Sequence, residues 1–175
     1  MSVFHSNTEM LIDYWRGRAF GGAPIDPADF APLAPQVFML GRAGPGGYAF
    51  RLAGGKVRDL FDRDLRGVQL MTLWRARDTG PLRTALEAAW RRSEPLVAQA
   101  HALGDRAMLP VELLFAPLGG DGPERVLGLA QPLAPLARLQ GEPAHRLALE
   151  RLSNASHDLP CPHLRLATLY GQRIA

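Results

Sequence analysis

The side chains best suited to bind a metal lie near the C-terminus, where His157, Cys161 and His163 fall within seven residues. A thiolate and two imidazoles are groups that zinc accepts, but structural zinc sites normally use four ligands. The flanking Pro160 and Pro162 also fit an exposed reactive or haem-responsive thiol. We expect an unstructured tail without a metal, and the role of these three residues stays open.

Catalytic chemistry would need a nucleophile, a base and an orienting group brought together by the fold. Ser153, His157 and Asp158 are only neighbours in a weakly patterned segment. His101 lies in a predicted strand, without a second histidine spaced to support a haem. The glycines of residues 41–47 match neither a dinucleotide fingerprint nor a phosphate loop, and a hairpin turn explains them better. We therefore expect no enzyme, no catalytic residue and no firmly assigned cofactor.

Arg51 is the most informative polar residue, because it is a full cation inside an otherwise apolar run. If its side chain faces a pocket, the planar guanidinium could hold a carboxylate or phosphate through two hydrogen bonds. If it faces outward, we expect it to pair across the sheet with an acid such as Glu112. The structural role is favoured over the ligand anchor.

Length and composition limit the class of protein to which this chain can belong. A chain of 175 residues with 47% hydrophobic residues supports one domain with extensions, and no apolar run is long enough to cross a membrane. The absence of a signal-like N-terminus and the single cysteine indicate a cytoplasmic protein. The cations are nineteen arginines and one lysine spread along the chain, so we expect no nucleic-acid binding.

An amphipathic helix is predicted at the N-terminus. Ser6 and Glu9 have the spacing of a capping box, and the helix should end by residues 21–22. Its apolar face is expected to carry Met10, Leu11, Tyr14 and Trp15. Prolines then predict a stiff connector, with a single turn at residues 26–30.

Two strands should follow, at residues 37–40 and 48–52, joined as a hairpin. Alternation places Tyr48, Phe50 and Leu52 on one face and Arg51 on the other.

Short helices are predicted next, after Gly54 and at residues 70–74. A longer helix should begin at Pro81, with Asp78 and Thr79 as candidate caps, and should be closed by Pro95. Its apolar positions have helical spacing and are Leu82, Ala85, Leu86, Ala89 and Trp90.

Three strands complete the predicted domain, at residues 96–103, 108–118 and 126–130. The short turns between them imply an antiparallel meander. Beyond Pro132 the pattern weakens, and a helix over residues 143–153 is the only element suggested there.

This order of elements resembles the PAS superfamily, and in particular bacterial stand-alone PAS proteins with a Tyr-Trp helix before the domain. The resemblance covers roughly residues 8–133, and Asp62 departs from it because glycine is expected there. The matching motifs are Tyr14-Trp15, residues 33–40, residues 50–54, Leu60-Phe61, residues 64–67, Leu73-Trp74, residues 112–118 and Leu127-Gly128.

The resemblance implies an α+β fold in which a five-stranded antiparallel sheet carries short helices on one face. It implies an N-terminal helix and connector at residues 1–32, a PAS domain at 33–133 and a partly helical or disordered extension at 134–175. Core packing is the simpler explanation of the apolar residues between helices and sheet, and a ligand pocket is the functional one. The pocket residues expected on the latter view are Arg51, Val57, Leu60, Phe61, Leu70, Leu73, Trp74, Leu86 and Trp90.

Such domains typically sense a ligand or partner, so we expect a non-catalytic regulator of bacterial signal transduction, in stress, nutrient or cell-cycle control. An unknown small ligand and a sensor kinase or other signalling protein are the expected partners. A constitutive adaptor without a ligand is the alternative. The face with Met10, Leu11, Tyr14 and Trp15 could cover its own sheet or form a homodimer seam.

Overall fold

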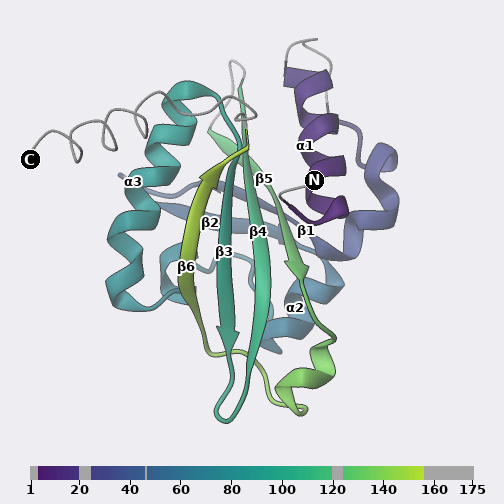
Figure 1. The fold of residues 1–175 in the computed structure, drawn as a ribbon. Coiled ribbons are helices and arrows are strands. Elements are labelled where there is room, and N and C mark those ends of the chain that lie inside the picture. The colour runs from purple at the N-terminus through teal and green to yellow at the C-terminus, as the bar shows by residue number, and fades with distance from the viewer. Residues whose placement is uncertain (1–3, 20–24, 46, 120–123, 156–175) are drawn as a thin grey trace, which may run out of the picture.

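The computed structural model describes residues 4–19, 25–45, 47–119 and 124–155 (Figure 1). An N-terminal helix α1 (Ser6–Ala19) precedes a kinked 3-10 segment η1 (Pro27–Gln36), and these lead into a mixed α and β domain. The other described helices are α2 (Gly55–Phe61), the 3-10 turn η2 (Leu70–Leu73), α3 (Ala76–Arg92) and the 3-10 turn η3 (Leu136–Leu139).

The described strands form a six-stranded antiparallel sheet in the order β2-β1-β5-β4-β3-β6. The expected antiparallel sheet and N-terminal helix are confirmed, but the sheet has one strand more than predicted. The strands are β1 (Val37–Arg42), β2 (Tyr48–Ala53), β3 (Leu96–Leu103), β4 (Met108–Leu118), β5 (Arg125–Pro132) and β6 (Arg146–Asn154).

The additional strand corrects the prediction of a helix over residues 143–153. Leu147 and Leu149 lie two residues apart, and β6 pairs with β3 through them, with Ala102 opposite Leu147 and Ala100 opposite Leu149. The free edge of β3 supplies a ladder of hydrogen bonds that no local pattern reveals. Tertiary pairing therefore overrides the weak helical signal.

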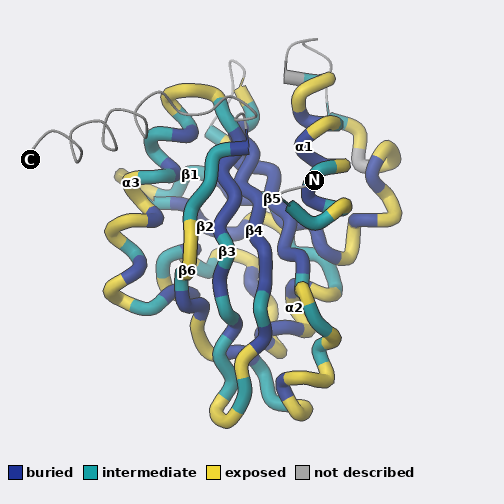
Figure 2. Tube along the Cα trace, in the orientation of Figure 1, coloured by how far each residue is buried: buried dark blue, intermediate teal, exposed yellow. Residues whose placement is uncertain are grey.

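The inner face of the sheet packs against α2, η2 and α3 in one hydrophobic core. Figure 2 shows β4 and β5 buried along most of their length, whereas the loops and the outer turns of the helices are exposed. As predicted, α3 turns Leu82, Leu86 and Ala89 inward, and these side chains are at most 4% exposed.

The start of α3 differs from the prediction, because the helix begins at Ala76 and contains Pro81. A proline in a helix interior removes one backbone hydrogen bond. The extra first turn is held by other contacts: Thr79 Oγ1 donates to the Ala76 carbonyl, and the Asp78 carboxylate accepts from Leu149 N–H. Asp78 thus joins the helix to β6 instead of capping it.

The outer face of the sheet is covered in part by α1 and η1, which form a second core over β4 and β5. In Figure 1, α1 lies beside β5 and α3 lies on the opposite side, beyond β6. The helix starts at Ser6, but its cap is His5, whose imidazole Nδ1 accepts from Asn7 N–H at 3.1 Å. The predicted serine cap is therefore shifted by one residue.

A bulge in β2 changes the predicted faces of that strand. Leu40 pairs with Phe50, but Met39 pairs with Leu52, so Arg51 is an extra residue. An inserted residue reverses the alternation of side chains beyond it. Tyr48 and Phe50 are buried as expected, but Leu52 is turned outward and is 53% exposed.

Candidate functional site

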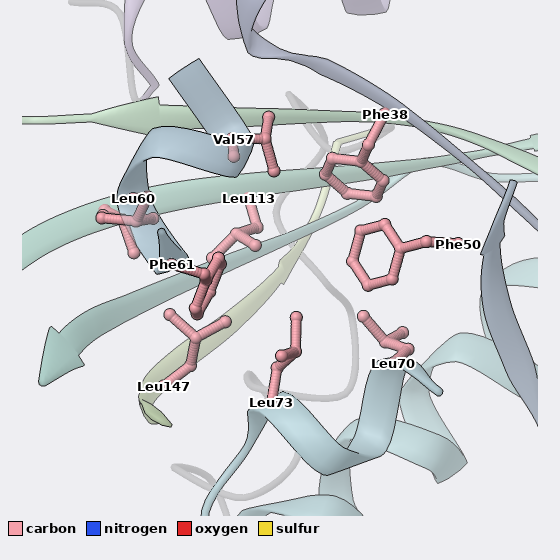
Figure 3. Close-up of a pocket in the computed structure, with 11 residues that line it drawn as sticks. Phe38, Phe50, Val57, Leu60, Phe61, Leu70, Leu73, Leu113 and Leu147 are labelled. Carbon is pink, nitrogen blue, oxygen red and sulfur yellow. The ribbon is translucent and has the colours of Figure 1, made fainter. Parts of the chain in front are cut away.

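A small cavity lies between α2, η2 and the inner face of the sheet. Figure 3 shows the labelled side chains converging on it from both the helices and the strands. The residues that line it are all apolar: Phe38, Phe50, Val57, Leu60, Phe61, Leu70, Leu73, Val111, Leu113, Ala130 and Leu147.

The residues that flank α2, Gly54 and Asp62, are both constrained by the backbone around them. Gly54 precedes the helix, and a Cβ atom there would lie 2.3 Å from the Ala34 carbonyl oxygen, so only glycine fits. Asp62 ends the helix with φ 47°, in the left-handed region that favours glycine. Asparagine and aspartate tolerate this conformation best among the other residues. The departure from the family pattern at position 62 is therefore compatible with the turn.

The cavity is almost filled. It offers about 10 Å³ to the centre of a water-sized sphere, close to the minimum for one water molecule. Ligand sites in proteins typically enclose about 300–1,000 Å³. In this conformation the interior is a packed core, and a ligand would have to displace side chains to enter.

Five predicted pocket residues do meet around the cavity: Val57, Leu60, Phe61, Leu70 and Leu73. Trp74 and Leu86 belong to the same core, and Trp90 packs against it, but these three do not line the cavity. Ligand binding by any of them stays a prediction.

Arg51 does not point into the cavity, which corrects its place among the pocket residues. As the extra residue of the β2 bulge it is exposed on the outer side of the sheet. Its side chain lies across Gly41, and its Nη2 donates to the Arg42 carbonyl at 3.3 Å.

The expected ion pair between Arg51 and Glu112 is not among those that the described residues form. Glu112 is 2% exposed and lies beneath the start of α1. Its Oε1 accepts from His5 N–H at 3.0 Å. Beside it, Gln131 accepts from Asn7 and from Gln36, at 2.9 Å each. This buried polar cluster anchors the N-terminal helix to the sheet.

Sequence reasoning missed several lining residues. Four of them, Phe38, Phe50, Val111 and Leu113, alternate along strands, so the inward face of each strand could have indicated them. Leu147 could not be found in this way, because its segment was interpreted as a helix.

The predicted interface face of α1 is divided between core and surface. Leu11 is fully buried and Trp15 is 4% exposed, and both pack against the outer face of the protein's own sheet. The Trp15 indole Nε1 donates to the Pro117 carbonyl at 2.7 Å. Tyr14 bonds to the backbone of Asp26, whereas Met10 is 54% exposed. The role of this face in a dimer stays a prediction.

Arg42 and Tyr48, at the hairpin end of β1 and β2, form a polar group with Glu124. Arg42 Nη1 lies 2.9 Å from Glu124 Oε2, and the Tyr48 hydroxyl lies 3.4 Å from both side chains. Burial raises the pKa of the Tyr48 hydroxyl, and the hydrogen bond from Arg42 offsets this in part. The group stays protonated at neutral pH and serves as a structural contact.

No group of three or more histidine, cysteine or acidic side chains in the described part of the chain could hold a metal ion. His101 lies 3.6 Å from Glu150, at the sheet surface. His157, Asp158, Cys161 and His163 lie outside the described residues, so the expectation that they form neither a metal site nor a catalytic group is not tested. The helices within the described ranges are too short or too polar to cross a membrane.

Comparison with known proteins adds one finding to this geometry. A family model described as a PAS domain matches residues 3–131, which is more than half of the chain. A search of curated proteins found no match. The family description indicates a sensory or regulatory role, and PAS domains are generally non-catalytic sensory modules.

Proposed function

The chain belongs to the PAS domain family, and on this premise we propose that it is a non-catalytic regulator that acts through contacts with a signalling protein. The observation that carries the proposal is the filled interior, with room for about one water molecule among eleven apolar side chains. A sensor kinase is the partner we favour, in bacterial signal transduction and in the cytoplasm.

A ligand-gated sensor is the second candidate, and the convergence of apolar side chains from helices and strands around one cavity favours it. A ligand would have to be small and apolar, because the lining has no polar side chain. It would enter only if the elements around the cavity moved apart. The two candidates share the family but differ in whether the purified protein holds a small molecule.

Native mass spectrometry of untagged, freshly purified protein, with an absorption spectrum of the same sample, tests the choice. The proposal predicts the mass of the chain alone or of its multiples, and no visible absorption. A small molecule retained in stoichiometric amount would overturn the ligand-free regulator and support the sensor.

The partner is tested separately, by measuring the autophosphorylation rate of purified bacterial sensor kinases with and without the protein. We expect at least one kinase to change its rate when the protein is added. A Met10→Glu variant serves as a surface probe in the same assay, because Met10 is exposed on α1. Unchanged rates for every kinase would contradict the kinase as partner.

A further inference from the structure

Strand β6 lies beyond the family match, yet it closes the interior of the domain. The match ends at residue 131, and β6 occupies Arg146–Asn154. Leu147 is 1% exposed and is the one residue outside the matched segment that lines the cavity described above. Without β6, the β3 edge would be unpaired and the cavity would lose part of its wall.

The outer edge of β6 is held by two hydrogen bonds to its backbone, one from a backbone amide and one to a carboxylate. Arg75 N–H donates to the Leu147 carbonyl, and Leu149 N–H donates to Asp78 Oδ2, each at 3.0 Å. Both partners lie at the junction of η2 and α3. The strand is therefore held between β3 and the first turn of α3.

Burial along β6 is uneven. Leu147 and Ala148 are buried, but Glu150 and Arg151 are exposed, and the strand beyond them is only partly covered. By contrast, β4 is buried over most of its eleven residues (Figure 2). Segments with few buried apolar contacts open at a lower free energy than the core of the same protein.

One buried polar group at this junction lacks a hydrogen bond to any described residue, which costs free energy while β6 is in place. Trp74 is 2% exposed, and its backbone forms an isolated parallel β-bridge with Leu147. Its indole Nε1 has no hydrogen-bond acceptor among the residues that the structure describes. A buried donor without a partner is unfavourable, and water could satisfy it if β6 moved away.

We propose that β6 is a releasable strap that closes the interior through Leu147 and opens it by detaching from β3 and Asp78. Release exposes Trp74, frees the β3 edge and removes one wall of the cavity. This inference goes beyond the proposed function and does not depend on it, because it concerns an opening of the protein alone. It would provide a route into the core that leaves the other five strands paired.

Native-state hydrogen exchange followed by NMR tests the strap on the full chain without denaturant. The amides of β6 and the Trp74 indole N–H should exchange together, and faster than the amides of β4. The Trp15 indole, bonded to the Pro117 carbonyl, should stay protected and serves as the internal reference. Exchange of β6 and β4 in a single opening would overturn the proposal, whatever mass spectrometry reveals about ligands.

Asp78→Ala removes the acceptor of Leu149 N–H and should accelerate β6 exchange by about 5- to 100-fold, while β4 changes little. Asp78→Asn retains a side-chain carbonyl acceptor and should restore most of the protection. Asp13→Ala is the matched control, because Asp13 is an exposed carboxylate on α1. Equal acceleration of β6 and β4 in Asp78→Ala would contradict a strap. If Asp78→Ala does not fold, the comparison of β6 and β4 exchange in the wild-type protein still tests the proposal.

Discussion

Phe38 contacts two further aromatic rings in the core, with ring centroids 5.4 Å from Phe50 and 5.8 Å from Phe115. It also lies over the backbone of β5, where Gly128 leaves room for the ring. A Cβ atom at position 128 would lie 2.0 Å from a Phe38 ring carbon. This glycine is needed for close packing, and its conformational freedom is not used.

Gly128→Ala should therefore lower the free energy of unfolding by about 1–3 kcal/mol, because the ring must move within a filled core. Gly17→Ala is the control, since nothing lies within 4 Å of a Cβ there and alanine favours the helix by about 0.5–1 kcal/mol. Urea unfolding of both variants measures the two effects. Similar shifts of the same sign would contradict the close packing of Phe38 on β5.

Tyr48 gives a prediction for high pH. Because burial raises its pKa in the folded protein, the stability it contributes is complete below the unfolded pKa of about 10 and is lost as pH rises through the folded pKa. The free energy of unfolding should fall with pH in this window, and the fall should be smaller in Tyr48→Phe. Urea unfolding at successive pH values measures the difference between the two proteins. A constant difference up to the folded pKa would contradict the raised pKa.

At the scale of elements, α1 presents different residues to its own sheet and to solvent. Leu11 and Trp15 are buried, so substituting either disturbs folding and tests dimerisation poorly. Met10 is exposed on the same helix and offers a cleaner probe.

Met10→Glu should leave the free energy of unfolding within about 0.5 kcal/mol of the wild type, as is usual for surface substitutions. If α1 forms a dimer seam, the variant should be monomeric in sedimentation experiments at concentrations where the wild type is a dimer. Trp15→Ala, in comparison, should cost about 3–5 kcal/mol, because a large buried side chain is removed. A dimer that persists in Met10→Glu would argue against this exposed position as part of the seam.

At the scale of the whole molecule, the sheet ends in two edges that are both partly covered. Phe50 N–H donates to the Val68 carbonyl beside β2, and Asp78 accepts from Leu149 beside β6. Covered edges limit unwanted pairing between chains.

A chain ending at residue 133 should lose this protection, because it lacks β6 and exposes the β3 edge. We expect a lower urea midpoint and concentration-dependent association, measured by light scattering. The chain ending at residue 155 is the control, since it keeps β6. Equal midpoints and no association of the shorter chain would indicate that the domain does not depend on β6.

The sequence by itself determined most of the domain, because its elements have strong local patterns. The spacing of Leu82, Leu86 and Ala89 identified α3, and the short turns between three strand-like runs identified the meander of β3, β4 and β5. Five of the cavity residues were expected because they are the apolar residues of the predicted short helices. The PAS family could also be identified from the sequence, because the order of elements and their motifs can be seen along the chain.

Only the tertiary structure decided the features that depend on long-range contacts. Leu147 joins the core because the β3 edge offers a ladder to β6, and Leu52 is turned outward because a bulge in β2 reverses the alternation after Arg51. Helix α3 starts early because Asp78 meets a backbone amide 71 residues away. The filled cavity likewise follows from packing among side chains of several elements, and packing of this kind has no local signature.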